Sequence, residues 1–191
     1  MIPTVAIRAA ALVLSLLPLA EANAQVADPA MITAEQQAIA KFAWMDGTWR
    51  GPATTKTPSG DHEVMQTERI GSMLGGTLKV IEGKGFNADG STGFNAFAVI
   101  SFDPGTKKYT FRSYAQGRVG TFAIAPQGTG YVWEIPAGGM TIRYTATVEN
   151  GLWREVGDRI VPGQPAQRFF EMTLTRVADT KWPSTGGLGP K

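Results

Sequence analysis

The sequence has no cysteine and a single histidine, His62, among its 191 residues. The absence of cysteine excludes disulfides, thiolate metal sites and a cysteine nucleophile. It also excludes the anchor of bacterial lipoproteins, which is attached to a cysteine at the cleavage site. One histidine cannot supply a metal site that needs two or three histidines from one chain. We therefore expect no bound metal and no cofactor.

Charge of one sign and recognisable catalytic motifs are also scarce. Eighteen Lys and Arg against sixteen Asp and Glu give a net charge of +2. No run of basic residues is longer than two, so the sequence lacks the basic patch of a nucleic-acid-binding protein. It contains neither a Gly-x-Ser-x-Gly nucleophile motif nor a phosphate-binding loop. The length and composition indicate one globular domain. The motif search gives no sign of a catalytic function.

A long apolar run occurs only at the N-terminus. Arg8 precedes an almost continuous apolar stretch from Ala9 to Ala20, and Ala22-Asn23-Ala24 forms a small-x-small cleavage signal. The stretch is shorter than the roughly 20 residues that a bilayer span needs. The pattern predicts that residues 1–24 are a cleaved signal peptide. The mature protein is then periplasmic or secreted, from a Gram-negative bacterium, with no integral membrane segment.

The mature chain divides into three parts. We expect residues 25–32 to form a leader, residues 33–177 to form one domain, and residues 178–191 to form a flexible tail rich in Gly and Pro. Thr33 opens a capping-box pattern, which predicts a short helix over about residues 33–44.

Beyond this helix, apolar and polar residues alternate with the period of a half-buried strand. Nine turn signals divide the region into ten segments: Pro58–Asp61, Gly75-Gly76, Asn87–Gly90, Asp103–Gly105, Gln116-Gly117, Gln127–Gly130, Gly138-Gly139, Asn150-Gly151 and Pro162-Gly163. Short connections favour antiparallel pairing of consecutive strands, and closure removes the exposed edges. The sequence predicts an all-β fold, a barrel of about ten antiparallel up-and-down strands with a short N-terminal helix. A β-sandwich is the alternative.

The alternation also predicts a core. It is expected to contain Trp49, Phe97, Val99, Phe111, Ile142, Tyr144, Trp153, Phe170, Met172 and Leu174. Charged residues stand at several strand positions: Glu68, Arg69, Arg112, Arg143, Arg154 and Glu155. Most should face solvent, and the apolar face around Ile142 puts Arg143 outside. An arginine that does face inward needs a partner, so Arg112, beside Tyr114, could bind an anionic group.

Two ends of the predicted domain should meet if the barrel closes. Gly47 lets the chain turn from helix to strand, and Trp49 can then fill the barrel end. Arg176 ends the last strand, which neighbours the first in a closed barrel. We expect Gly47, Trp49 and Arg176 to form the closure, with the Arg176 guanidinium stacked on the Trp49 ring.

A set of short motifs carries a resemblance: Gly47-Thr48-Trp49, Thr67-Glu68-Arg69, Met73-Leu74-Gly75-Gly76, Phe102-Asp103-Pro104, Gly151–Glu155 and Phe170–Arg176. In this order, over about Phe42 to Val177, the chain resembles the DUF1579 family of bacterial proteins of unknown function, within the calycin-type barrels (lipocalins, fatty-acid-binding proteins and nitrobindin-like proteins). The resemblance implies a ligand-holding barrel and no established reaction. Nitrobindin-like relatives bind haem through a histidine late in the barrel, and this chain has none there.

The expected function is therefore binding of a small apolar or amphipathic ligand, including an anionic amphipath, without catalysis. The ligand-binding candidates are Trp49, Glu68, Arg112, Tyr114 and Trp153. One alternative is a packed barrel that acts as a structural or interaction module, which would lack a cavity of the roughly 300 Å³ that ligand sites need. Another is a hydrolase or isomerase that uses an inward-facing Glu68 with an arginine. The oligomeric state is left open.

Overall fold

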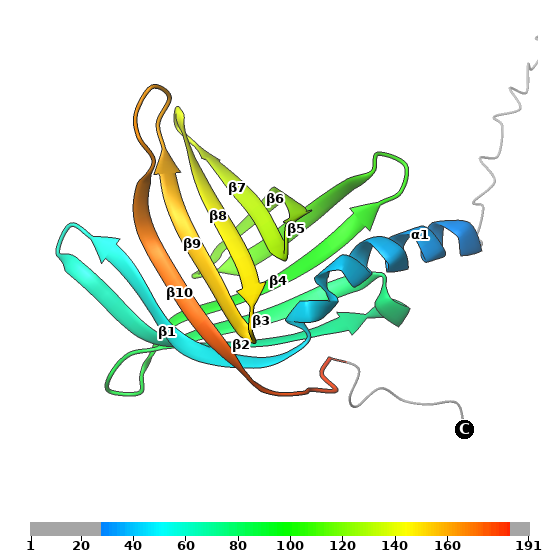
Figure 1. Cartoon of the computed structure of the whole chain (residues 1–191), viewed down its shortest axis with the longest axis horizontal. Coiled ribbons are helices and arrows are strands. Elements are labelled where there is room, and N and C mark those ends of the chain that lie inside the picture. The colour runs from blue at the N-terminus through cyan, green and yellow to red at the C-terminus, as the bar shows by residue number, and fades with distance from the viewer. Residues whose placement is uncertain (1–27, 184–191) are drawn as a thin grey trace, which may run out of the picture.

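The computed structural model describes residues 28–183, and in them ten antiparallel strands form a closed barrel (Figure 1). Each strand pairs with its neighbours along the chain, and the first strand pairs with the last. The predicted ten-stranded up-and-down barrel with a short N-terminal helix is thus confirmed. The predicted signal peptide lies outside the described residues, as do residues 184–191 of the predicted tail.

The helical elements are α1 (Pro29–Ile39), η1 (Ala40–Met45) and η2 (Leu74–Gly76). The strands are β1 (Gly47–Thr57), β2 (Gly60–Met73), β3 (Leu78–Phe86), β4 (Thr92–Asp103), β5 (Lys108–Ala115), β6 (Arg118–Gln127), β7 (Gly130–Ala137), β8 (Met140–Glu149), β9 (Leu152–Ile160) and β10 (Gln167–Ala178). All nine predicted turn signals fall at the junctions between consecutive strands. Asn150 and Gly151, for example, both have positive φ, as a two-residue hairpin turn requires.

The helix begins earlier than the sequence pattern predicts. The Asp28 carboxylate caps α1 by accepting hydrogen bonds from the backbone N–H groups of Ala30 and Met31. Proline suits the first helical position because it has no N–H to satisfy there. The predicted N-cap, Thr33, lies inside the helix and donates its hydroxyl to the Pro29 carbonyl. The predicted leader therefore contributes its last residues to α1.

The helical segment closes one end of the barrel (Figure 1). Phe42 and Met45 are buried in the same core cluster as residues of the barrel wall. The Phe42 ring packs edge-on against Tyr109 of β5, with ring centroids 5.6 Å apart. An ion pair also stabilises this end, because the ammonium group of the buried Lys79 on β3 lies 2.5 Å from the partly exposed Asp46 carboxylate.

The closure of β1 on β10 differs in one contact from the sequence-based expectation. Trp49 and Arg176 are register partners, but the Arg176 guanidinium donates to the Asp46 carbonyl oxygen and pairs with Asp179. It lies over Gly47, whose φ is 126° and where an added Cβ would be 2.8 Å from Arg176 Nη2. Trp49 points inward instead, and its indole N–H donates to the Met45 carbonyl. The predicted stacking of Arg176 on Trp49 is therefore wrong, because the guanidinium reaches past the strand end.

The last described residues are packed against the barrel. The sequence predicts a flexible tail from residue 178, but β10 includes Ala178. The Arg69 guanidinium on β2 lies 4.7 Å above the Trp182 ring. An added Cβ at Gly71 would be 2.1 Å from the Trp182 carbonyl oxygen. The folded domain thus reaches at least Pro183, because Arg69 and Gly71 hold the segment in place.

The wall of the barrel is paired unevenly. The pairing of β6 with β7 runs from Ile124↔Trp133 to Gln127↔Gly130, whereas β4 and β5 pair from Ala96↔Ala115 to Asp103↔Lys108. The β6 segment 118–123 pairs with β5 alone in the described chain. The barrel is therefore splayed between β6 and β7 at the end away from the helix.

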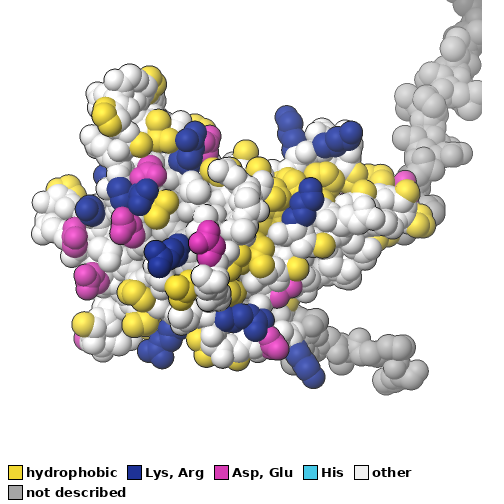
Figure 2. Space-filling model, viewed as in Figure 1, with side chains coloured by type: hydrophobic (Ala, Val, Ile, Leu, Met, Phe, Trp, Pro, Cys, Tyr) yellow, Lys and Arg dark blue, Asp and Glu magenta, His cyan; other side chains and the backbone are white. Residues whose placement is uncertain are grey.

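Charged side chains lie mostly on the outer surface. In Figure 2, basic and acidic side chains are interspersed over the strands at the left, and hydrophobic side chains gather beside α1. Arg143 pairs with Glu134, as the alternation of β8 predicts for an outward Arg143, and Arg168 pairs with Asp158. Within residues 28–183, no helix has the length and apolar character needed to cross a bilayer.

Candidate functional site

The barrel contains a cavity of about 680 Å³ that opens at the end away from the helix. Small-molecule sites occupy roughly 300–1,000 Å³. Small side chains on the inner face of β4, Ala96 and Ala98, leave room for it. The predicted alternative of a fully packed barrel does not fit a cavity of this size.

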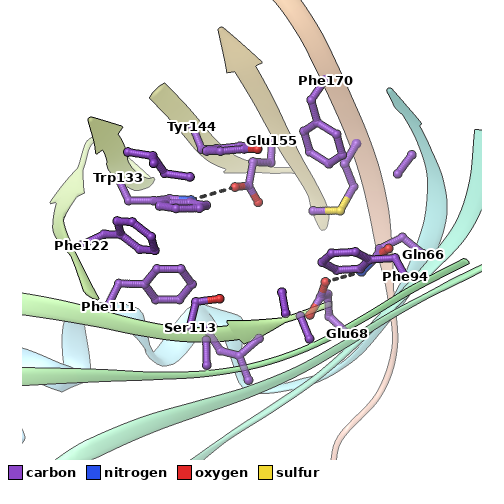
Figure 3. A pocket seen from close by; sticks show the side chains of 18 of the residues that line it. Gln66, Glu68, Phe94, Phe111, Ser113, Phe122, Trp133, Tyr144, Glu155 and Phe170 are labelled. Carbon is purple, nitrogen blue, oxygen red and sulfur yellow. Dashed lines mark hydrogen bonds between the residues drawn. The ribbon is translucent and has the colours of Figure 1, made fainter. Parts of the chain in front are cut away.

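Aromatic rings form one wall of the cavity, as Figure 3 shows. The rings of Trp133 on β7 and Tyr144 on β8 stack almost parallel, with centroids 4.4 Å apart. Phe111 on β5 and Phe122 on β6 pack against Trp133 at 4.9 and 5.5 Å. Phe170 on β10 meets the edge of Tyr144 at 5.8 Å. This wall offers flat apolar surfaces to a ligand.

A buried carboxyl group, that of Glu155 on β9, lies beside the aromatic wall. Glu155 is 7% exposed. The Tyr131 hydroxyl donates to its Oε2 at 2.8 Å, and the Trp133 indole N–H donates to its Oε1 at 3.2 Å. Burial raises the pKa of Glu155, and these two hydrogen bonds oppose the rise. Burial of the Tyr144 hydroxyl, together with the charge of Glu155, raises the pKa of Tyr144 to about 12.

A second carboxyl group, that of Glu68 on β2, faces the same cavity (Figure 3). Gln66 donates its amide N–H to Glu68 Oε1 at 2.7 Å. The carboxyl lies over Gly83 of β3, where an added Cβ would be 2.8 Å from Oε1 and would make the Glu68 carboxyl shift. Burial raises the pKa of Glu68 most strongly, the charges of Glu155 and Glu82 add to the rise, and the Gln66 hydrogen bond opposes it, so that the pKa is about 8.

The basic residues that line the cavity are at its rim. They are His62 and Arg118, both exposed and close to the β1–β2 and β5–β6 hairpins. In the described chain, the cavity lining includes no further Lys, Arg or His. The ionisable side chains deep in the cavity that could carry a charge at neutral pH are therefore carboxyl groups, and the sequence-based expectation of an interior arginine for an anionic ligand is not met.

Two predicted ligand-binding residues, Arg112 and Tyr114, lie on the outside of β5. The Arg112 guanidinium donates to the Tyr114 hydroxyl at 2.8 Å, and Tyr114 is 43% exposed. Phe111 and Ser113 occupy the inner face of β5, so alternation places their neighbours outside. The assignment of Arg112 and Tyr114 to the cavity is wrong for this reason.

The remaining predicted residues lie at or below the cavity. Trp153 lines its floor and is 2% exposed. Trp49 packs edge-on beneath it, with ring centroids 5.7 Å apart. Two predicted core residues are misplaced: Phe97 is 39% exposed and Val99 shares its outer face. The inner face of β4 is taken by the alanines that make room for the cavity.

Sequence reasoning missed part of the site. The ligand-binding residues predicted from the sequence do not include Gln66, Tyr131 or Trp133. They also do not include Glu155, which the sequence marks only as one of several charged strand residues. Strand parity could have found two of them. Glu155 lies two residues from the inward Trp153, and Gln66 lies two residues from Glu68. No comparable signal marks the convergence of β2 and β9 on one cavity.

The site has limited means for chemistry. The inward-facing Glu68 meets one requirement of the predicted acid–base enzyme, but the arginine partner that this alternative also needs does not line the deep cavity. Among residues 28–183, no group of three or more His, Asp or Glu side chains is placed to hold a metal ion. What the arrangement provides is an apolar, aromatic enclosure with two acidic hydrogen-bonding groups.

No model of a known protein family matches the sequence, and no curated protein matches it. Among solved structures, the fold is similar to the crystal structure of Rv2717c from M. tuberculosis, with a TM-score of 0.55. The two chains are 12% identical, and the match covers 73% of this chain and 97% of that one. At this identity the similarity concerns the barrel fold alone.

Proposed function

We propose that the protein binds a small amphipathic molecule in the barrel cavity and carries out no reaction on it. The observation that carries this proposal is the cavity of about 680 Å³, lined by stacked aromatic rings and by the carboxyl groups of Glu68 and Glu155. Ligand sites commonly combine a mostly apolar lining with a few convergent polar groups. The absence of a catalytic motif in the sequence agrees with a binding role.

Binding would draw mainly on desolvation. Burying about 200 Å² of apolar ligand surface gains about 5 kcal/mol before the entropic cost of association. The Glu68 and Glu155 carboxyl groups would orient the polar end of the ligand, because each accepts hydrogen bonds inside the cavity. The splayed seam between β6 and β7 lies at the open end and gives the ligand access.

The proposal is tested by filling the cavity. Ala96→Phe places an aromatic ring among the lining residues, whereas Ala125→Phe adds the same ring on the exposed outer face of β6. With the neutral fluorescent probe N-phenyl-1-naphthylamine, we expect Ala96→Phe to weaken binding at least tenfold and Ala125→Phe to leave it unchanged. Equal binding by both variants, or no binding of any ligand to the wild type by native mass spectrometry or fluorescence, would contradict the proposal.

We also propose that the chain is an exported member of the DUF1579-like, calycin-type barrels. The closed meander of ten strands and the closure by Gly47, Trp49 and Arg176 support the barrel group. The N-terminal sequence pattern supports export. Expressed in a Gram-negative host, the protein should appear in the periplasmic fraction with Gln25 as its first residue, as measured by intact mass. An uncleaved chain retained in the cytoplasm would contradict the export proposal.

A further inference from the structure

We infer that the cavity selects a cationic amphipath, a protonated amine on an apolar body, whose ammonium group lies between Glu68 and Glu155. This inference rests on the proposed function and names the class of ligand. It follows from two observations: the acidic groups in the cavity that have no cationic partner in the described chain, and the aromatic rings beside them.

The two carboxyl groups lack cationic partners. In the described chain, the side chains that hydrogen-bond to them are Gln66 for Glu68, and Tyr131 and Trp133 for Glu155. The ion pairs within residues 28–183 all lie outside the cavity, on the outer surface or at the closed end of the barrel. Buried carboxylates without a counter-charge are unfavourable. A ligand cation would pair with both groups at once, after displacing the proton that Glu68 holds at neutral pH.

The aromatic wall favours the same ligand. The hydrogen bond from the Trp133 indole N–H holds the Glu155 carboxyl beside the stacked rings of Trp133 and Tyr144. These two rings cover one face of each other, and a cation over an uncovered ring face is attracted by the ring quadrupole. The remaining surface of Phe111 and Phe122 would contact the apolar body of the ligand.

Anionic ligands are disfavoured by the same groups. A ligand carboxylate beside Glu68 and Glu155 would add a third acidic group to the enclosure. The basic side chains of the lining, His62 and Arg118, are solvent-exposed at the rim, where their charges are screened. A neutral ligand would gain the apolar contacts but leave the carboxyl groups without a counter-charge.

Cation binding should depend on pH. The titratable groups that face Glu68 across the cavity are Glu155, Tyr131 and Tyr144, with His62 and Arg118 at the rim and Glu82 on the outer face of β3. The pKa of Glu68 is about 8, so an ammonium group that binds at neutral pH displaces its proton. Affinity should therefore rise by up to tenfold per pH unit between pH 6 and 8, and level off above pH 8.

The test compares three ligands that differ only in their polar group: decylamine, decanol and decanoate. Each is measured by displacement of N-phenyl-1-naphthylamine from the wild type at pH 6, 7 and 8.5. We expect decylamine to displace the probe at concentrations at least tenfold below those of decanol at pH 7, with decanoate weakest. The preference for decylamine should grow with pH, while that for decanol stays constant.

Variants assign the effect to residues. Glu68→Gln should abolish most of the pH dependence and reduce the preference for decylamine about tenfold, whereas Glu134→Gln on the outer surface should change neither. Decanol binding reports that each variant is folded. Equal affinities for decylamine and decanol, or a preference for decanoate, would overturn the cation inference and leave the binding proposal standing. Failure of the wild type to bind the probe and all three ligands would overturn the binding proposal itself.

Discussion

Replacing Glu68 by Gln is expected to remove most of the loss of stability that this barrel undergoes between pH 5 and pH 8. The pKa of Glu68 is about 8 in the folded protein, against 4.5 for an unperturbed glutamate. Between these values the folded chain holds a proton that the unfolded chain has released. The free energy of unfolding therefore falls as the pH rises through this window, by about 1.4 kcal/mol per pH unit, and becomes constant above pH 8.

Glutamine is a close test of this effect because it is uncharged and has nearly the same shape. Its side-chain oxygen can still accept the hydrogen bond from Gln66. Urea unfolding of the ligand-free protein at pH 5, 6.5 and 8 measures the slope. Glu155, whose pKa is raised by burial, should leave a smaller slope of the same sign in the variant. Parallel pH profiles for the wild type and Glu68→Gln would contradict the prediction, and Glu134→Gln serves as the surface control.

Phe42→Ala is expected to destabilise the protein by about 3–5 kcal/mol. Phe42 is fully buried where the helical segment closes the barrel. Its ring centroid lies 5.6 Å from that of Tyr109 on β5 and 6.5 Å from that of Tyr131 on β7, so it joins η1 to two strands of the wall. Truncation removes the transfer energy of the ring and leaves a void that surrounding backbone can only partly fill.

Denaturant unfolding at pH 6 measures this loss. Met31→Ala, on the exposed face of the same helical segment, is the matched control and should change stability by no more than about 0.5 kcal/mol. A loss below about 1 kcal/mol for Phe42→Ala would show that the helical segment is not part of the core. The variant should also weaken binding of the neutral probe. Loss of the Phe42 ring would let Tyr131 shift, and Tyr131 lines the cavity and donates to Glu155.

The turns and the number of strands could be predicted because they depend on local chemistry. Asn150 and Gly151 show this, since positive φ is a property of those residues themselves. The start of the helix was missed for a related reason: Asp28 and Pro29 form a stronger N-terminal signal than the capping-box pattern at Thr33. The sequence thus contains two local start signals for this helix, and the N-terminal one forms the cap.

The faces of the strands and the composition of the site could be predicted only in part. Glu68 and Trp153 line the cavity, but Arg112 and Tyr114 do not. Alternation groups residues by face without saying which face points inward until one residue is anchored. That Glu68 and Glu155 face the same cavity could not be predicted, because it depends on how β2 and β9 are placed around the closed barrel.

The topology has a consequence for the order in which the protein assembles. Every strand pair except β1 with β10 joins segments that are adjacent in the chain. The β1–β10 contact between Arg50 and Thr175 spans 125 residues, for which loop closure costs about 4 kcal/mol beyond a constant. Hairpins can therefore form early and sequentially, and the last strand must be present before the ring can close. Until then the inner face of the incomplete sheet remains exposed to solvent. The slow step of folding should be the pairing of β10 with β1.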